Sequence, residues 1–123
     1  MTKTRILTPL AIAASAVAIL PAAAQAKSSY CSSSGDVCYG VVKGSSPIKL
    51  QIVLQAKYFS HFRLCIKGPN GRTDCKRFKI KKLSHGQYGK TVRVGKLYPF
   101  EGKGTYHASF ITGGQTLGPA ITY

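Results

Sequence analysis

Few side chains in this 123-residue chain are able to perform acid–base chemistry. It has three histidines, and its three carboxylates are Asp36, Asp74 and Glu101. A pair formed by His107 and Glu101, with basic side chains holding a phosphate, would be the arrangement of a small nuclease. The sequence contains no Gly-x-Ser-x-Gly step, no His-Glu-x-x-His motif and no paired carboxylates. We therefore expect a non-catalytic protein, with a secreted nuclease or toxin-like enzyme as an alternative.

The four cysteines, which could bind a metal, instead predict two disulfides. Cys31 and Cys38 are separated by six residues, and Cys65 and Cys75 by nine, whereas structural zinc sites use pairs about two to four residues apart. Gly-Pro-Asn-Gly at residues 68–71 is a turn signal, and a turn centred there places Cys65 opposite Cys75. The spacing favours the pairs 31–38 and 65–75. We expect no metal site and no cofactor.

Positive charge is the strongest functional signal in the chain. Lys and Arg number 18 against three acidic residues, which gives a formal charge of +15. In the register that joins Cys65 to Cys75, Arg63 lies directly opposite Arg77, and alternation along that strand turns Arg77, Lys79 and Lys81 to one side. The candidate anion-binding residues are Arg63, Lys67, Arg77, Lys79, Lys81 and Lys82.

A basic face of this kind would bind polyanions without sequence preference, because charge alone carries no base-specific information. The expected partners are teichoic acid, an acidic glycan, an anionic lipid or extracellular DNA. No recognition helix or zinc finger for reading bases is apparent in the sequence. The alternative interpretation is a charged surface that only keeps the protein soluble.

Residues 1–26 have the pattern of a cleaved secretory signal peptide. Lys3 and Arg5 precede an apolar stretch over residues 6–20, and the segment ends in an Ala-x-Ala step at Ala26. The apolar stretch is interrupted and shorter than the roughly 20 residues of a membrane span, so we expect no transmembrane anchor after processing. Loss of Lys3 and Arg5 lowers the formal charge from +15 to +13. The predicted location is secreted, either extracellular or associated with the cell wall, where disulfides persist.

The rest of the chain predicts an all-β fold: an antiparallel, immunoglobulin-like β-sandwich of about seven strands with two disulfides. Residues 27–35 are expected to form an N-terminal arm and disulfide loop, and residues 36–123 a single sandwich domain. Apolar and polar residues alternate over residues 48–56, which indicates a half-buried strand of about nine residues. Further strands are expected at residues 37–42, 62–66, 78–80 and 105–112, with Val92 and Val94 at the head of another.

Two hairpins have registers that the sequence predicts. A two-residue turn at Gly113 and Gly114 places Phe110 opposite Leu117 and Tyr106 opposite Ile121. In the hairpin that carries Cys65 and Cys75, apolar and charged residues are instead mismatched. The mismatch leaves two possibilities, a tip that overhangs the core or a bulge that shifts the register. The mismatched pairs are Leu64 with Lys76 and Ile66 with Asp74.

Gly102, Gly104 and Tyr106 form a Gly-x-Gly-x-Tyr step just before an expected strand. In a tyrosine corner, such a tyrosine donates a hydrogen bond back to the preceding crossover. The alternative is an ordinary core tyrosine. This step, the strand count and the closing hairpin resemble the small secreted immunoglobulin-like or fibronectin type III-like domains of actinobacterial type. That resemblance implies a fold, because many such domains have no assigned function.

A narrower resemblance is to the neocarzinostatin-type apoproteins, which are exported seven-strand sandwiches that carry an enediyne chromophore. Cys65 and Cys75 on adjacent strands are similar to one of that family's two bridges, and residues 118–123 are loosely similar to its ending. Cys31 and Cys38 depart from the family, as does the basic charge. The resemblance implies a small-ligand carrier as a further alternative function.

Overall fold

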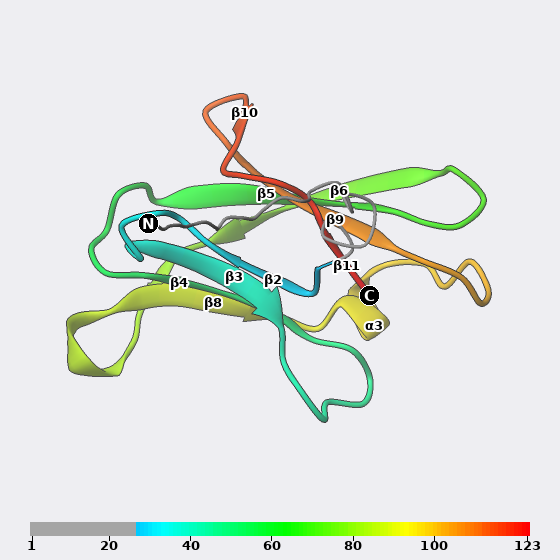
Figure 1. Ribbon diagram of the computed structural model, residues 1–123, viewed down its shortest axis with the longest axis horizontal. Coiled ribbons are helices and arrows are strands. Elements are labelled where there is room, and N and C mark those ends of the chain that lie inside the picture. The colour runs from blue at the N-terminus through cyan, green and yellow to red at the C-terminus, as the bar shows by residue number, and fades with distance from the viewer. Residues whose placement is uncertain (1–26) are drawn as a thin grey trace, which may run out of the picture.

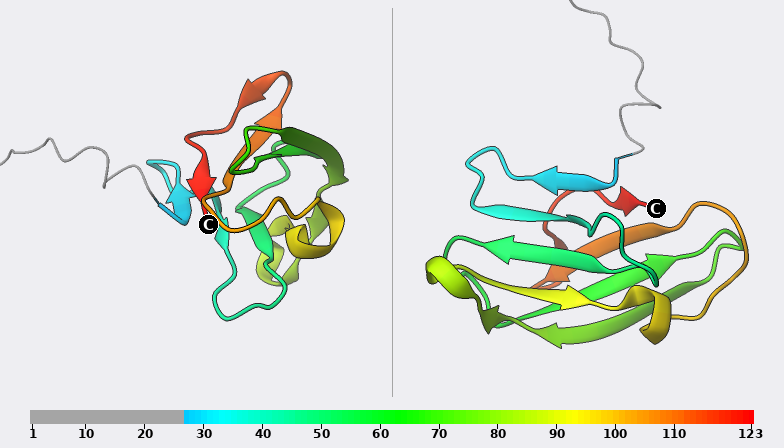
Figure 2. Two further views of the ribbon diagram at one scale, coloured as in Figure 1. Left: turned by 90° about the vertical axis from the view of Figure 1, so that its right-hand side faces the viewer. Right: turned by 90° about the horizontal axis from the view of Figure 1, so that it is seen from below.

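Residues 27–123, which the computed structural model describes, form two antiparallel sheets packed face to face (Figure 1). Strands make up 45% and helices 7% of these residues, which confirms the all-β sandwich with two disulfides. The views in Figure 2 show the same two layers from the side and from below. The predicted signal peptide, residues 1–26, lies outside the described residues.

Ten short strands are described where seven were expected. The first sheet contains β5 (His61–Lys67), β6 (Thr73–Lys79), β9 (His107–Thr112), β10 (Gln115–Thr116) and β11 (Ile121–Thr122), in the order β10–β9–β5–β6 with β11 also paired to β9. The second sheet has the order β2–β3–β4–β8–β7. Its strands are β2 (Ser29–Cys31), β3 (Val37–Val41), β4 (Leu50–Leu54), β7 (Lys81–Lys82) and β8 (Tyr88–Val92).

Alternating apolar residues place the core between the sheets. Leu50, Ile52 and Leu54 of β4 have no exposed surface, and Leu64 of β5 and Phe110 of β9 close the core from the opposite sheet. Complete burial of such side chains contributes about 1.5–3 kcal/mol each. The predicted strand over residues 48–56 is therefore present, but only its central five residues pair as β4.

The β5–β6 hairpin has the predicted register and both predicted disulfides are present, at Cys31–Cys38 and Cys65–Cys75. Pairing runs without a bulge from His61 with Lys79 to Lys67 with Thr73. β6 is an edge strand, so its inner side overhangs the core. Leu64 is fully buried, while Lys76 opposite it stays exposed, with its ammonium group 5.8 Å from the centre of the Tyr98 ring. The mismatch is explained by an overhanging edge.

The chain passes from one sheet to the other at Ile80. The Ile80 N–H still donates to the Ser60 carbonyl of the first sheet (2.8 Å), and its side chain is buried. The next two residues form β7, which pairs with β8 of the second sheet. The predicted single row of Arg77, Lys79 and Lys81 on one sheet face is therefore wrong beyond Lys79.

Val92 and Val94 do not head a strand. Val92 is the last residue of β8, and Val94 begins the short helix α3 (Val94–Leu97). A Cβ atom on Gly95 would lie 2.5 Å from Pro47 Cβ, so glycine allows this helix to pack directly on the segment before β4. The Gly95 N–H donates to the Ile48 carbonyl at 3.0 Å. A second helical turn, η2 (Ser84–Gly86), joins β7 to β8.

The hairpin after β9 begins in the predicted register and then shifts by two residues. The Leu117 N–H donates to the Phe110 carbonyl (2.8 Å) as predicted, but Ile121 pairs with Ala108. Tyr106 consequently exchanges backbone hydrogen bonds with Tyr123 and not with Ile121. The intervening residues include Pro119, which has no N–H for a ladder.

Candidate anion-binding face

The outer side of β5 and β6 carries four of the six candidate residues and is called the basic face here. Register and alternation place Arg63, Lys67, Arg77 and Lys79 on this side, and all four are exposed. Arg63 lies directly opposite Arg77. Like charges in that position destabilise a sheet by some tenths of a kcal/mol. The opposed guanidinium groups therefore leave a local excess of positive charge on this face.

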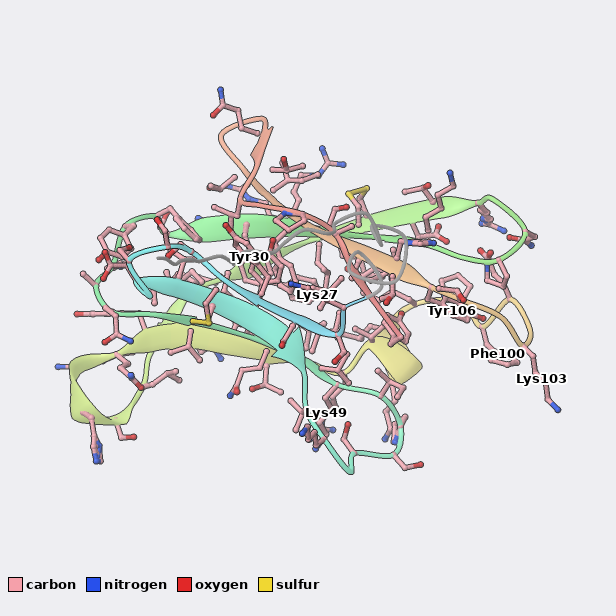
Figure 3. All side chains as sticks on the ribbon, viewed as in Figure 1. Lys27, Tyr30, Lys49, Phe100, Lys103 and Tyr106 are labelled. Carbon is pink, nitrogen blue, oxygen red and sulfur yellow. A yellow bond between two sulfur atoms is a disulfide. The ribbon has the colours of Figure 1, made fainter. Side chains whose placement is uncertain are left out.

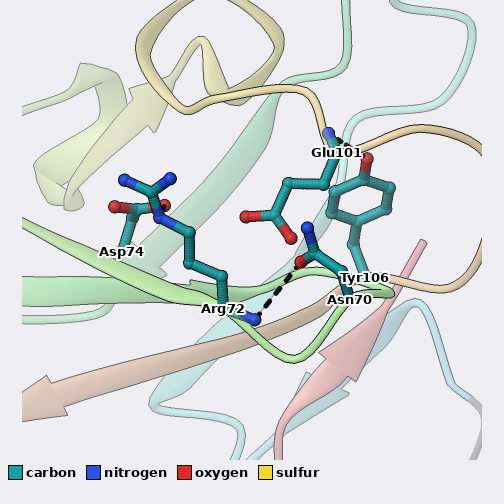
Figure 4. Close-up of polar contacts among 5 residues, drawn as sticks. All are labelled: Asn70, Arg72, Asp74, Glu101 and Tyr106. Atoms are coloured by element: carbon teal, nitrogen blue, oxygen red, sulfur yellow. Dashed lines mark hydrogen bonds and ion pairs between the residues drawn. The ribbon is translucent and has the colours of Figure 1, made fainter.

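None of the chain's three carboxylates lies on the basic face. Asp74 points inward opposite Ile66, where it forms the one salt bridge within residues 27–123, with Arg72 at 3.7 Å (Figure 4). The Glu101 side chain packs against the backbone of the β5–β6 turn. Asp36 lies in the loop between β2 and β3 of the other sheet. The basic face is therefore left without an internal counter-charge.

A depression of about 470 Å³ makes part of the basic face concave. Arg63, Arg77 and His61 line it on one side, and the β9–β10 turn closes the other. This hairpin projects away from the sheet (Figure 1). The Thr112 hydroxyl donates to the His61 carbonyl (3.1 Å), and Ser60 Oγ lies 2.9 Å from His61 Nδ1. Two guanidinium groups beside a concavity suit a phosphate or carboxylate, because each can donate paired hydrogen bonds.

Lys81 and Lys82 are exposed on β7 and therefore belong to the edge of the second sheet. The segment from Lys76 to Lys82 is basic throughout its length, but it passes around the side of the sandwich and does not remain on one face. A ligand that contacts all six candidate residues would have to follow this curve.

A second cationic cluster, which sequence reasoning missed, lies beside β6. An edge groove of about 530 Å³ has an apolar floor that includes Phe78, and four basic residues around it. Phe78 belongs to the same strand as Arg77 and Lys79, so β6 separates the groove from the basic face. One basic residue precedes β4 and the other three lie within residues 90–96, each separated by two neutral residues, so no continuous charge run reveals them. They are Lys49, Lys90, Arg93 and Lys96.

The alternation of inward and outward residues along β8 was the one sequence signal that could have indicated this groove. Lys90 lies opposite Ile52, which is fully buried, so Lys90 is on the inner side of its strand. A lysine at an inward position indicates an open edge, because an ammonium group is not buried without a partner. β7 covers only the part of β8 at Tyr88 and Gly89, and Lys90 lies beyond it.

The imidazoles and carboxylates of the candidate nuclease lie on different elements. His107 is exposed on the outer side of β9 opposite Lys67, whereas the Glu101 carboxylate faces Gly68. Within residues 27–123, no group of three or more His, Cys, Asp or Glu residues could hold a metal ion. In the same part of the chain, no helix is long and apolar enough to cross a membrane.

The predicted tyrosine corner is present beside the β5–β6 turn. The Tyr106 hydroxyl donates to the Gly102 carbonyl (2.7 Å) and accepts from the Glu101 N–H (2.8 Å), as Figure 4 shows for Glu101. Gly104 has a φ of 141°, and a Cβ there would lie 2.6 Å from Pro69 Cβ. Glycine therefore allows the crossover to lie against the turn that leads into β6.

Comparisons with known protein families, with curated proteins and with solved structures give no match for this chain. The geometry of the described residues is thus the basis for any functional assignment.

Proposed function

We propose that this protein is a secreted, non-catalytic binding domain that holds anionic polymers of the cell envelope or the extracellular space on its basic face. The observation that carries the proposal is the exposed Arg63–Arg77 pair on a face without a carboxylate. The two disulfides support an oxidising compartment. As part of this proposal, we infer that the protein is related to secreted immunoglobulin-like domains. The sandwich and the tyrosine corner support this relation.

The spacing of the charges favours an extended polymer over a single small anion. Alternate residues of a strand lie about 6.6–6.8 Å apart, and directly opposed residues about 5 Å. Lys79, the opposed pair Arg63 and Arg77, and Lys67 therefore occupy the first, second and fourth outward-facing levels of the hairpin, a line of charge about 20 Å long. Teichoic acid, acidic glycans and DNA present repeated charges on flexible or elongated chains. Close beside β6, the edge groove offers further cations to the same polymer.

The test is the salt dependence of binding to teichoic acid, heparin and DNA between about 50 and 300 mM salt. Four neutralised phosphates predict a slope of log K against log salt of about −2.8 to −3.6, because each contact releases counterions. We expect similar slopes for all three polymers, since charge does not distinguish them. Contacts in the edge groove would make the slope steeper.

Three matched double reversals locate the surface, because each changes the net charge by the same amount at exposed positions. Arg77→Glu with Lys79→Glu alters the basic face and is expected to remove most of the affinity. Arg93→Glu with Lys96→Glu alters the edge groove and is expected to have a smaller effect. Lys43→Glu with Lys57→Glu alters two exposed loop lysines that line neither the depression nor the edge groove, and serves as the control.

The proposal fails if the wild-type protein does not bind any of the three polymers at low salt. It also fails if the control reversal weakens binding as much as the basic-face reversal, since binding would then follow net charge alone. If the groove reversal weakens binding more than the basic-face reversal, the polymer site is the edge groove and not the basic face.

A further inference from the structure

An apolar cavity of about 380 Å³ lies at the end of the sandwich and shares no lining residue with the depression on the basic face. Its lining includes the side chains of four aromatic residues, Tyr98, Phe100, Tyr106 and Tyr123, and the single cation Lys103. Figure 3 shows Phe100, Lys103 and Tyr106 together at the end of the molecule that carries the loop between α3 and β9. This volume falls in the range of about 300–1,000 Å³ that small-molecule sites occupy, and such sites are mostly apolar with a few polar groups.

The cavity is preformed, because the loop that makes it is fixed at both ends. The Tyr98 hydroxyl donates to the Leu64 carbonyl of β5 (2.6 Å). The Tyr106 hydroxyl holds the backbone of Glu101 and Gly102. A ligand would not have to order this loop, so the loop adds little conformational entropy cost to binding.

Three of the aromatic rings form a nearly parallel ladder beside the cavity. Phe100 and Tyr106 have ring centres 6.3 Å apart with planes at 19°, and Tyr106 and Tyr123 have centres 5.3 Å apart with planes at 11°. Phe100, at the outer end of the ladder, is 80% exposed. An exposed aromatic ring that continues a stack leaves one apolar face free for another flat ring.

The polar groups of the cavity favour an anion. The hydroxyls of Tyr98 and Tyr106 are already engaged with the backbone. Within residues 27–123, the Tyr123 hydroxyl has no hydrogen-bond partner, and burial, with Tyr106 beside it, raises the pKa of Tyr123 so that it stays a donor. Lys103 supplies a positive charge, and no Asp or Glu side chain lines the cavity. The Lys103 charge disfavours a cationic ligand.

We propose that this cavity is a binding site for a small planar aromatic molecule that bears one negative charge, with its ring stacked on Phe100 and its anionic group near Lys103. The site is independent of the basic face, since no residue lines both. It gives the molecule a means of holding a small ligand as well as a polymer.

The probe for the test is naphthalene-2-sulfonate, with 2-naphthol as its uncharged counterpart, titrated at about 300 mM salt to suppress charge-driven binding elsewhere. Binding is followed by NMR, which also reports which ring protons shift. We expect saturable shifts at Phe100, Tyr106 and Tyr123. Naphthalene-2-sulfonate should bind more tightly than 2-naphthol.

Phe100→Ala is expected to weaken both probes by about tenfold or more, and the fold is expected to survive because the side chain is 80% exposed. Tyr58→Ala is the matched control, because Tyr58 is an exposed aromatic outside the cavity. Lys103→Gln should weaken the sulfonate but not 2-naphthol, which separates the role of charge from that of stacking.

Any of three results would overturn the proposal. The first is an unchanged affinity in Phe100→Ala, and the second is an equal loss in Tyr58→Ala. The third is a set of shifts on Arg63, Arg77 and their neighbours in place of the aromatic ladder. None of these results contradicts polymer binding on the basic face, so the failure of this proposal can be told apart from the failure of that one.

Discussion

Three tyrosine hydroxyls form hydrogen bonds with the backbone, two of them with segments that are distant in the sequence. The Tyr98 hydroxyl donates to the Leu64 carbonyl, and the Tyr39 hydroxyl donates to the Pro119 carbonyl at 2.7 Å. Tyr106 makes its two bonds within its own loop. A buried hydroxyl that loses its partner costs about 1–3 kcal/mol. These bonds therefore hold the crossover loop and the end of the chain in place.

Tyr106→Phe removes one hydroxyl and keeps the ring. Because the Gly102 carbonyl and the Glu101 N–H both lose their partner, we expect the free energy of unfolding to fall by about 1–2 kcal/mol. Urea denaturation followed by circular dichroism measures the change. Tyr58→Phe is the control, since Tyr58 is 53% exposed. An unfolding midpoint equal to that of the control variant would mean that Tyr106 acts only through its ring.

At the scale of elements, the junction between β10 and β11 depends on close contacts of Gly118. A Cβ on Gly118 would lie 2.6 Å from the Tyr30 ring and 2.8 Å from the Tyr39 hydroxyl oxygen. Tyr39 is buried, and its hydroxyl donates a hydrogen bond to the Pro119 carbonyl. The chain after β10 therefore packs directly against Tyr30 of β2 and Tyr39 of β3. These contacts hold the segment in place where its register with β9 shifts by two residues.

Gly118→Ala is expected to lower the free energy of unfolding by about 1–3 kcal/mol, because the added methyl group must displace Tyr30 or Tyr39. Thermal and urea unfolding give the size of the effect. Thr116→Ala, at an exposed position of β10, is the matched control. If Gly118→Ala were as stable as the control, the contact with the two tyrosines would be too loose to determine the register.

Elements whose contacts are local could be predicted, and those set by distant packing could not. The turn at residues 68–71 and the spacing of Cys65 and Cys75 determine the β5–β6 register by themselves. By contrast, alternation continues unchanged through Ile80, so nothing local reveals that the chain changes sheets there. The edge groove was missed for the same reason, since only the fold brings Lys49 and Phe78 together with the cations of residues 90–96. The tyrosine corner was found because it spans only a few residues.

At the scale of the whole molecule, burial of tyrosines makes stability depend on alkaline pH. Burial, with Tyr30 beside it, raises the pKa of Tyr39 to about 12, and burial also raises the pKa values of Tyr98 and Tyr123. Unfolded tyrosines ionise near pH 10. Above that pH the unfolded chain loses protons that the folded chain keeps, so the equilibrium moves toward unfolding.

The contribution of these tyrosines is complete below about pH 10 and is lost as the pH rises toward the folded pKa values. Each such tyrosine lowers the unfolding free energy by about 1.4 kcal/mol per pH unit in that window. Urea unfolding at a series of alkaline pH values measures the loss. In ultraviolet titration, three of the seven tyrosines should ionise late. Tyr39→Phe should make the pH dependence shallower, and an unchanged slope would contradict this assignment.

Lys76 and Lys90, two of the lysines on inner sides of their strands, have a consequence for how copies of the protein meet. Each lies where a sheet ends, on β6 and on the uncovered part of β8. A second copy that extended either sheet at these edges would have to enclose an ammonium group between apolar layers, which is strongly unfavourable. We therefore expect that copies crowded along one polyanion coat it side by side as separate particles and do not fuse into a fibre.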